Sequence, residues 1–376
     1  MKIHIWTGSM GGHVRIAQAL THALNTRYPA AVVHTIDIYS AAYLSRWFAG
    51  TTNVYDRMVA RAPRLWGTTY HLTRQRPVMW LVRQVGARFT RRAALHRLMD
   101  DDAPDVIVNV ISDLGQLKVL PRVARAAGRA APPVVTVISD LVNIHRGWLV
   151  PQAALVVVPT EPAYAACRAY GVPAERLRRL GYPIRSHLFC HADKPPAPTP
   201  NEALRVLAMG GSSGSGRLVD DVRGLAASGL RLDLTVVCGK NAAVQHKLEP
   251  LAMGGAGRCD VRVLGYTDRI PDLMRAADLL LTKAGPSTMF EAVACQLPSL
   301  VTAHLPGQES GNAAYFARLG VALEAPTPAD VVRLVRQLDA DRPRLAAMRN
   351  PELARQTCAG AGQIAEAIVE TAAHAG

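Results

Sequence analysis

The chain alternates short, unbroken apolar runs with stretches that have the apolar spacing of helices. Ten runs rich in valine, isoleucine and leucine have the length of strands, and they lie at residues 2–6, 31–36, 105–111, 134–139, 154–159, 203–210, 232–239, 260–265, 278–283 and 299–304. Because strands buried on both faces read as continuous apolar runs, this pattern predicts parallel sheets covered by helices. The strand–helix alternation indicates an α/β protein built from doubly wound domains.

A polar stretch separates the two sets of strands. Residues 190–203 contain four prolines and no apolar periodicity, which is typical of a linker. The length of 376 residues also suits two domains better than one. We therefore expect an N-terminal domain over 1–190, a linker over 191–202 and a C-terminal domain over 203–376, with the last helix free to pack back on the N-terminal domain.

Composition narrows the class of protein. Apolar residues make up 49% of the chain, which excludes wholesale disorder. No apolar run approaches the roughly 20 residues of a membrane-spanning helix, and the first residues read as a strand, so we expect a location in the cytoplasm or on its membrane face. The six cysteines are scattered and lack metal-ligand spacing, which predicts separate thiols rather than a disulfide scaffold or a zinc ribbon.

The net charge of +14 is concentrated in one segment. Residues 46–97 contain 11 arginines and one acidic residue, Asp56, and they also hold seven of the 20 aromatic residues. An arginine-rich surface interleaved with aromatics suits anionic lipid headgroups or nucleic acid, and a solvated basic face is the simplest alternative. The residues that we expect at a membrane surface are Trp47, Phe48, Trp66, Trp80, Arg88, Arg91, Arg92 and Arg97.

A glycine-containing loop follows the first predicted strand and precedes a helix. It runs from Thr7 to His13 and includes Gly11 and Gly12, which allow a ligand to approach the backbone closely. The loop does not match the GxGxxG pattern of dinucleotide sites. His13 would lie at the helix start, at the carboxyl end of a strand, where it could act as a general base or cap the helix.

Three loops in the second half have the residues that a nucleotide diphosphate sugar requires. Small residues at 209–216 form a candidate phosphate cradle without the sequel of a Walker A loop. In the segment 283–292, Ser287 or Thr288 can cap a helix in which Glu291 would accept bonds from ribose hydroxyls. The polar loop 306–312 offers the donors and acceptors that recognise a sugar.

These motifs resemble the family 28 glycosyltransferases. Residues 285–292 followed by 306–312 look like the C-terminal half of that family, and the GQExGN form of the second motif is similar to the monogalactosyldiacylglycerol synthases and bacterial diglucosyldiacylglycerol synthases. In the N-terminal half, residues 139–148, 158–160 and 181–184 resemble the TDL…H..W…VPS…G.PV series of the same branch.

The resemblance implies the GT-B fold, with two Rossmann-like domains facing a central cleft, and an inverting transfer of galactose or glucose from a UDP-sugar to a diacylglycerol-type lipid. The implied donor-binding residues are Gly211, Ser212, Ser213, Gly265, Tyr266, Ile270, Gly285, Ser287, Thr288, Glu291, Gln308, Glu309 and Asn312. His13 is the candidate base, and the acceptor-side candidates are Gly11, Gly12, Asp140, His145 and Trp148. For the last three, a cap, a satisfied loop histidine and a core tryptophan are the alternatives.

Two departures from the family pattern lie on the acceptor side. Met10 and Val14 change the usual GGGHR loop, and Ser112-Asp113-Leu114 stands where the family has His-Pro.

No DxD-like or histidine-rich cluster is evident, so we expect no essential metal or other cofactor. The alternatives are a family 28 transferase that uses UDP-N-acetylglucosamine and a polyprenyl-linked or other lipid acceptor, and, more remotely, a non-catalytic nucleic-acid-binding protein. The expected partners are the UDP-sugar, the lipid acceptor and an anionic membrane surface on its cytoplasmic face, without nucleic acid.

Overall fold

A computed structural model describes residues 1–8, 11–49, 58, 62–190, 199, 202–210, 217–253 and 258–374. The chain divides into two compact units. Unit 1 comprises Met1–Arg185, Pro306–Gln308 and Ala359–Gly376, and unit 2 comprises Ser186–Leu305 and Glu309–Cys358. Each unit is described by itself.

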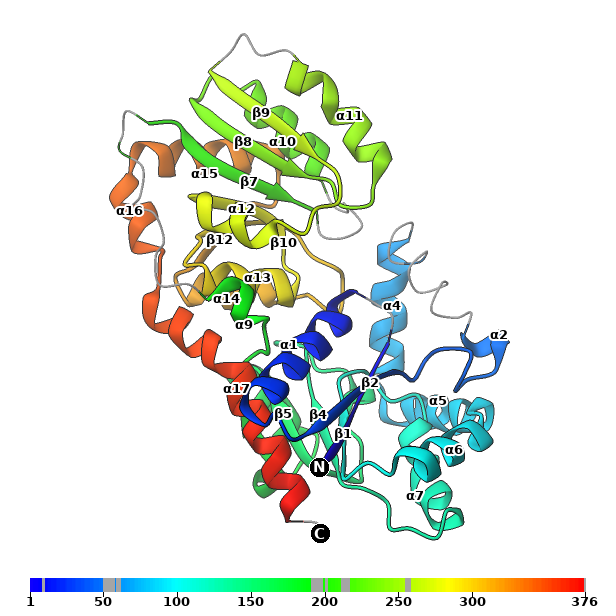
Figure 1. Ribbon diagram of the computed structural model, residues 1–376. Helices are drawn as coiled ribbons and strands as arrows, with labels where there is room; N and C mark the ends of the chain where they lie inside the picture. Colours follow the sequence, from blue (N-terminus) through cyan, green and yellow to red (C-terminus); the bar gives the residue numbers. More distant parts are fainter. Residues whose placement is uncertain are drawn as a thin grey trace. The chain divides into compact units, whose positions relative to one another are not determined.

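Unit 1 is built on a parallel six-stranded sheet in the order β2-β1-β3-β4-β5-β6. Figure 1 labels its strands β1, β2, β4 and β5. Its strands are β1 (Lys2–Thr7), β2 (Val32–Asp37), β3 (Val106–Asn109), β4 (Val134–Val137), β5 (Ala153–Val158) and β6 (Leu177–Arg179). The central strands β3 and β4 are buried at every position, which is why their sequences are unbroken apolar runs.

Helices surround this sheet and complete the core of unit 1. They are α1 (Gly11–Arg27), α2 (Arg46–Ala49), α4 (Pro63–Thr73), α5 (Arg76–Phe89), α6 (Arg92–Asp102), α7 (Gln116–Ala126), α8 (Glu161–Ala169) and the short helices η1 (Arg146–Trp148) and η2 (Ala174–Arg176). The end of α17 (Pro351–Ala373) also belongs to unit 1, where Glu366 pairs with Arg27 and Glu370 pairs with Arg178.

Unit 2 repeats the architecture with a second parallel sheet, in the order β12-β11-β10-β7-β8-β9. Its strands are β7 (Leu204–Met209), β8 (Leu232–Val237), β9 (Cys259–Leu264), β10 (Leu279–Lys283), β11 (Ser299–Ala303) and β12 (Ala322–Glu324). Its helices are α9 (Ser186–Phe189), α10 (Leu218–Ala226), α11 (Ala242–Met253), α12 (Ile270–Ala276), α13 (Pro286–Ala294), α14 (Asn312–Arg318), α15 (Pro328–Ala340), α16 (Arg342–Ala347) and most of α17.

All ten predicted strands are present, and the predicted doubly wound α/β class is confirmed. The pattern missed β6 and β12. Each has three residues and lies at the edge of its sheet, so neither produces a long apolar run.

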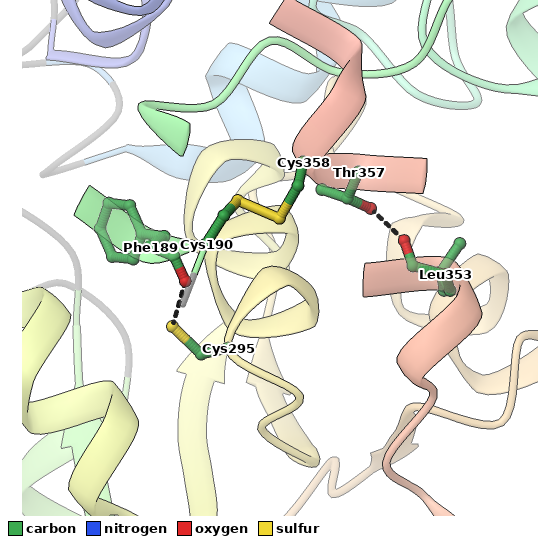
Figure 2. Close-up of a disulfide and its surroundings, with 6 residues drawn as sticks. All are labelled: Phe189, Cys190, Cys295, Leu353, Thr357 and Cys358. Carbon is green, nitrogen blue, oxygen red and sulfur yellow. Dashed lines mark hydrogen bonds between the residues drawn. A yellow bond between two sulfur atoms is a disulfide. The ribbon is translucent and has the colours of Figure 1, made fainter. Parts of the chain in front are cut away.

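A disulfide joins two cysteines that are 168 residues apart (Figure 2). Cys190 follows α9, and Cys358 lies in α17. The expectation of separate thiols is therefore wrong for this pair, because two distant helices bring them together in unit 2. Beside them, the Cys295 thiol donates to the carbonyl oxygen of Phe189 at 3.6 Å, and this contact links α9 to the end of α13.

Candidate active site

A cavity of about 260 Å³ lies in unit 1, at the carboxyl ends of its central strands. We call it the unit 1 cavity. Its apolar wall is formed by Leu44, Trp66, Met79, Val82, Ile111 and Leu114. Its polar or amphipathic residues are His13, Tyr39, Thr69, Tyr70, Thr73, Ser112, Asp140, His145, Trp148 and Gln308. A mainly apolar cavity with a few converging polar groups is typical of a small-molecule site.

His13 is the third residue of α1, and its ring is fixed by one backbone contact. Nδ1 lies 2.8 Å from the carbonyl oxygen of Val110, the residue that follows β3. Since a carbonyl oxygen only accepts, Nδ1 carries the proton of the neutral ring and Nε2 keeps its lone pair. Burial lowers the pKa of His13 to about 4. The imidazole is therefore neutral at physiological pH and able to accept a proton.

Asp140 follows β4 and has several donors around its buried carboxylate. Trp148 Nε1 donates to Oδ2 at 2.9 Å, and the backbone N–H of His145 donates to the same oxygen at 3.3 Å. Gln308 Nε2 lies 3.4 Å from Oδ1. Burial is the larger influence and raises the pKa of Asp140 to about 6, although these bonds act in the opposite direction. Its charge consequently changes close to neutral pH.

The ring of His145 is held on both sides. Its Nδ1 accepts from the backbone N–H of Gly147 at 3.0 Å, so the neutral ring carries its proton on Nε2 and donates to Thr73 Oγ1 at 3.0 Å. Burial lowers its pKa to about 4. With both nitrogens occupied, His145 shapes the cavity wall and is a weaker candidate for proton transfer than His13.

Sequence reasoning missed the contribution of α4 to this cavity. Tyr70 is buried, its hydroxyl donates to the carbonyl oxygen of Asn143 at 2.6 Å, and it lies 3.4 Å from Asp140 Oδ2. Trp66, predicted at the membrane surface, is only partly exposed and lines the cavity. The aromatic residues of this segment could be read from the sequence, but not which of them face inward.

In unit 2, α13 begins three residues after the end of β10, and Glu291 lies in its second turn. Gly285 is the N-cap and Pro286 the first helical residue, so the prediction that Ser287 or Thr288 caps the helix is wrong. Proline is favoured at this first position, where its missing N–H costs nothing. Ser287 and Thr288 lie in the first turn, and Glu291 is 2% exposed.

The loop after β11 contributes Glu309, whose two carboxylate oxygens are both engaged. Oε1 lies 2.5 Å from Lys283 Nζ, and Oε2 accepts from the backbone N–H of Leu305 at 2.8 Å. Asn312 begins α14 and donates to the carbonyl oxygen of Ala284 at 3.0 Å. These bonds bring the loops after β10 and β11 together at one edge of the sheet.

The remaining predicted donor residues lie at the same edge or outside the described parts of the chain. Gly265 follows β9, Tyr266 is 69% exposed beside Lys240, and Ile270 begins α12. Gly211, Ser212 and Ser213 lie outside the described residues. On the acceptor side, Gly11 and Gly12 begin α1, and Trp148 is buried with its ring 5.8 Å from that of His13.

Of the predicted membrane residues, Trp80 and the four arginines are exposed, whereas Trp66 lines the unit 1 cavity. The exposed ones belong to a surface that comprises α4, α5 and α6. Five large apolar side chains are exposed there, by 41–63%, and they are Leu65, Leu72, Trp80, Leu81 and Val85. Arg88, Arg91, Arg92 and Arg97 are exposed next to them along the chain. The side chains of Trp47 and Phe48 lie outside the description. Within the described residues, no helix has both the length and the apolar character needed to cross a bilayer.

One cluster of described residues has the donor types of a metal site. His4 and His34 are register neighbours on β1 and β2, and each has a ring nitrogen bonded to Asp102 Oδ2. Lys2 Nζ lies 3.5 Å from the other oxygen of Asp102 and competes with a cation there. If His4 bound a metal through Nε2, its proton would move to Nδ1, which is buried without an acceptor among the described residues. We assign no metal to this cluster.

Comparisons with known proteins agree with this architecture. Residues 13–184 match the monogalactosyldiacylglycerol (MGDG) synthase family, and residues 205–363 match the glycosyltransferase family 28 C-terminal domain. A processive diacylglycerol beta-glucosyltransferase of Bacillus cereus (strain B4264) is 28% identical over 98% of this chain and 93% of its own length. Monogalactosyldiacylglycerol synthase 1, chloroplastic, of Arabidopsis thaliana is 26% identical over 86% of this chain and 62% of its own.

Solved structures show the same fold. MurG of Acinetobacter baumannii is 15% identical with a TM-score of 0.60 and covers 98% of this chain and 99% of its own. The glycosyltransferase VinC in complex with DTDP is 15% identical with a TM-score of 0.59, over 100% of both chains. The two family matches follow one another along the chain, with residues 185–204 between them, and together span most of the sequence. The chain therefore belongs to the family 28 glycosyltransferases of GT-B fold, on the branch of the MGDG synthases and processive diacylglycerol glucosyltransferases.

Proposed function

We propose that this protein is an inverting glycosyltransferase that moves a hexose from a UDP-sugar to diacylglycerol and so produces a glycolipid. The observation that carries the proposal is the unit 1 cavity, in a chain of this family. Its apolar wall suits the glycerol end and upper acyl chains of a lipid, and His13 and Asp140 line it as titratable groups.

The His13 geometry supports a role as general base. The lone pair of Nε2 takes the proton of the acceptor hydroxyl while the hydroxyl oxygen forms a bond to the anomeric carbon of the donor. The bond between that carbon and the diphosphate oxygen breaks, and UDP leaves with the bonding pair. In-line displacement inverts the anomeric configuration. The ionised carboxylate of Asp140 favours the imidazolium that forms.

Unit 2 supplies the residues that we propose for the donor. The first turn of α13 presents backbone N–H groups at the positive end of the helix dipole. These groups are proposed to stabilise the charge that develops on the diphosphate. Glu291, one turn further, is proposed to hold the ribose hydroxyls. Glu309 is proposed to read the hexose, with its carboxylate kept in place by Lys283. Gln308, which belongs to unit 1, is proposed to share that role.

We further propose that the surface of α4, α5 and α6 docks on an anionic bilayer at the cytoplasmic face of the membrane. Exposed apolar side chains next to basic ones are the composition of an interfacial segment. Trp80, which is 63% exposed, is the strongest candidate for shallow insertion. Docking would keep the unit 1 cavity close to its lipid substrate.

A donor and acceptor screen tests the function. Purified protein is incubated with UDP-glucose, UDP-galactose or UDP-N-acetylglucosamine, and with vesicles that contain diacylglycerol, its monoglycosylated product or a polyprenyl-linked acceptor. Lipid products are identified by mass. We expect a hexosyl-diacylglycerol from UDP-glucose or UDP-galactose. A product formed only with the polyprenyl-linked acceptor would overturn the assignment of the acceptor.

A further inference from the structure

The exposed surface and the unit 1 cavity share one helix. On one side of α5, Trp80, Leu81 and Val85 are exposed, whereas Met79 and Val82 line the cavity. A membrane that contacts the exposed face of α5 would therefore act on a helix that also lines the cavity.

The side chain of Arg83 connects α5 to two other segments of the cavity wall, without lining the cavity itself. Its Nε lies 3.3 Å from Asp113 Oδ2 and 3.4 Å from the Asp113 carbonyl oxygen. Its Nη2 donates to the carbonyl oxygens of Gly147 at 2.9 Å and Arg146 at 3.2 Å. The guanidinium thus joins α5 to two separate segments, the loop after β3 and the helix η1. Its side chain is 16% exposed and is not among the residues that line the cavity.

Both segments carry cavity residues. The loop after β3 contributes Ser112 and Leu114, and η1 with its N-cap contributes His145 and Trp148. Trp148 in turn holds the carboxylate of Asp140. A backbone bond from Asp113 N–H to the Gly147 carbonyl oxygen, 2.9 Å long, ties the two segments directly to each other.

The contact between α5 and the loop leaves no space for adjustment. A methyl group on Gly86 would collide with the carbonyl oxygen of Leu114, and one on Gly115 would collide with the carbonyl oxygen of Arg83. Gly115 also has a φ of +124°, which side-chain-bearing residues rarely adopt. A shift of α5 must therefore move the loop, because the backbones are already in contact.

We propose that Arg83 is a positioning residue for the acceptor reaction. It holds α5, the 112–115 loop and η1 in one arrangement, so that the docked helix and the acceptor cavity act as one body. The guanidinium suits this task because its planar fork can serve a carboxylate and several carbonyl oxygens at once, which a lysine ammonium at the same place cannot do. The inference rests on the proposed function, since it concerns the cavity assigned to the lipid.

The test compares Arg83→Lys and Arg83→Met with Arg122→Met, a control at an exposed arginine of α7. Three quantities are measured: transfer to diacylglycerol in vesicles, slow hydrolysis of the UDP-sugar by water, and UDP affinity. We expect both Arg83 variants to lose about 10- to 100-fold in kcat/KM for transfer, the cost of a small misplacement near the reacting groups. Hydrolysis and UDP affinity should stay within about twofold of the wild type, because the residues proposed for UDP lie in unit 2 and water does not depend on the apolar wall that positions the lipid.

Two outcomes would overturn the proposal. Unchanged transfer in Arg83→Met would show that the wall holds its shape without the guanidinium. Equal losses of transfer, hydrolysis and UDP affinity would show a general structural role. If Arg83→Met does not fold, Asp113→Asn with Arg83→Lys provides the same comparison, because both keep the side-chain volume. A wild-type protein with no transfer to diacylglycerol would instead reject the proposed function, independently of the Arg83 variants.

Discussion

The Nδ1–H of His13 donates to the carbonyl oxygen of Val110 at 2.8 Å, and this bond determines which nitrogen of the ring is available for chemistry. In many histidine bases a carboxylate accepts this proton and raises the basicity of the ring. Here the acceptor is a neutral backbone group at the end of a central strand. Asp140 lines the same cavity as His13, and its carboxylate accepts from Trp148 Nε1.

This arrangement predicts the pH dependence of transfer. The pKa of His13 is lowered to about 4 and that of Asp140 is raised to about 6, so His13 loses its proton first as the pH rises and Asp140 ionises second. We expect kcat/KM for the acceptor to increase with pH through an apparent pKa of about 6. In Asp140→Asn this limb should disappear and leave the lower one of His13. A limb that persists unchanged in Asp140→Asn would mean that a different group titrates.

Replacement of the base should affect turnover and not donor binding. We expect His13→Ala to lower kcat by about 10²–10⁴, the usual contribution of a general base. UDP affinity, measured by calorimetry, should stay near the wild-type value because His13 lies in unit 1. His22→Ala, at an exposed position of the same helix, serves as the control. A loss of less than tenfold would move the role of base to Asp140.

The fold could be predicted from the sequence because its information is local. Strands such as Val106–Asn109 are buried along their whole length, and their sequences are therefore recognisable as apolar runs. His13 and Asp140 could be located for a related reason, since each follows a predicted strand and the carboxyl ends of parallel strands meet at one edge. The strands β6 and β12 were missed because three residues at the edge of a sheet are too few to produce a recognisable apolar run.

What could not be predicted depends on contacts between distant segments. Tyr70 and Thr73 reach the cavity because α4 packs over the strand ends, and nothing in their local pattern separates them from the exposed Leu72. The pairing of Cys190 with Cys358 depends in the same way on where α9 meets α17. Arg83 was counted among 11 arginines of a basic segment, although its partners are buried carbonyl oxygens and Asp113.

The proposed role of Glu291 in the donor site predicts how its replacement affects UDP binding. We expect Glu291→Gln to weaken UDP binding about tenfold or more, since a hydrogen bond to a charged group contributes roughly 1.5–3 kcal/mol. Glutamine preserves the volume of a side chain that is 2% exposed, so the fold should persist. Glu324→Gln, at an exposed position of β12, is the matched control. Equal UDP affinity of the variant and the wild type by calorimetry would remove Glu291 from the donor site.

The docking surface has a charged part and an apolar part, which salt distinguishes. Replacement of Arg88, Arg91, Arg92 and Arg97 with glutamine should reduce binding to anionic vesicles at low salt, because each basic residue near such a surface contributes about 1 kcal/mol. Trp80→Ala should instead reduce the binding that remains at high salt, where the Debye length is about 3 Å at 1 M. Co-sedimentation with vesicles measures both. If activity on a detergent-dispersed acceptor fell as much as activity on vesicles, the arginines would belong to the site.

The disulfide predicts how the stability of unit 2 depends on redox conditions. Cys190 and Cys358 are 168 residues apart, and the loop that they close contains nearly all of unit 2. Closing a loop of this length restricts the unfolded chain, and disulfides of this kind contribute about 2–5 kcal/mol to stability. We expect a reducing agent, or the Cys190→Ser and Cys358→Ser pair of changes, to lower the melting temperature by about 5–15 °C. Cys259→Ser, at a partly exposed free thiol, should have little effect.

Thiol labelling in denaturant gives an independent count: four reactive cysteines before reduction and six afterwards. Six reactive thiols without reduction, together with a melting temperature that ignores the reducing agent, would show that the bridge is absent in solution. Because Cys295 contacts Phe189 beside this bridge and caps the end of α13, UDP affinity should be measured in both redox states. A bridge that only restricts the unfolded chain leaves that affinity unchanged, whereas one that also positions α9 against α13 lowers it on reduction.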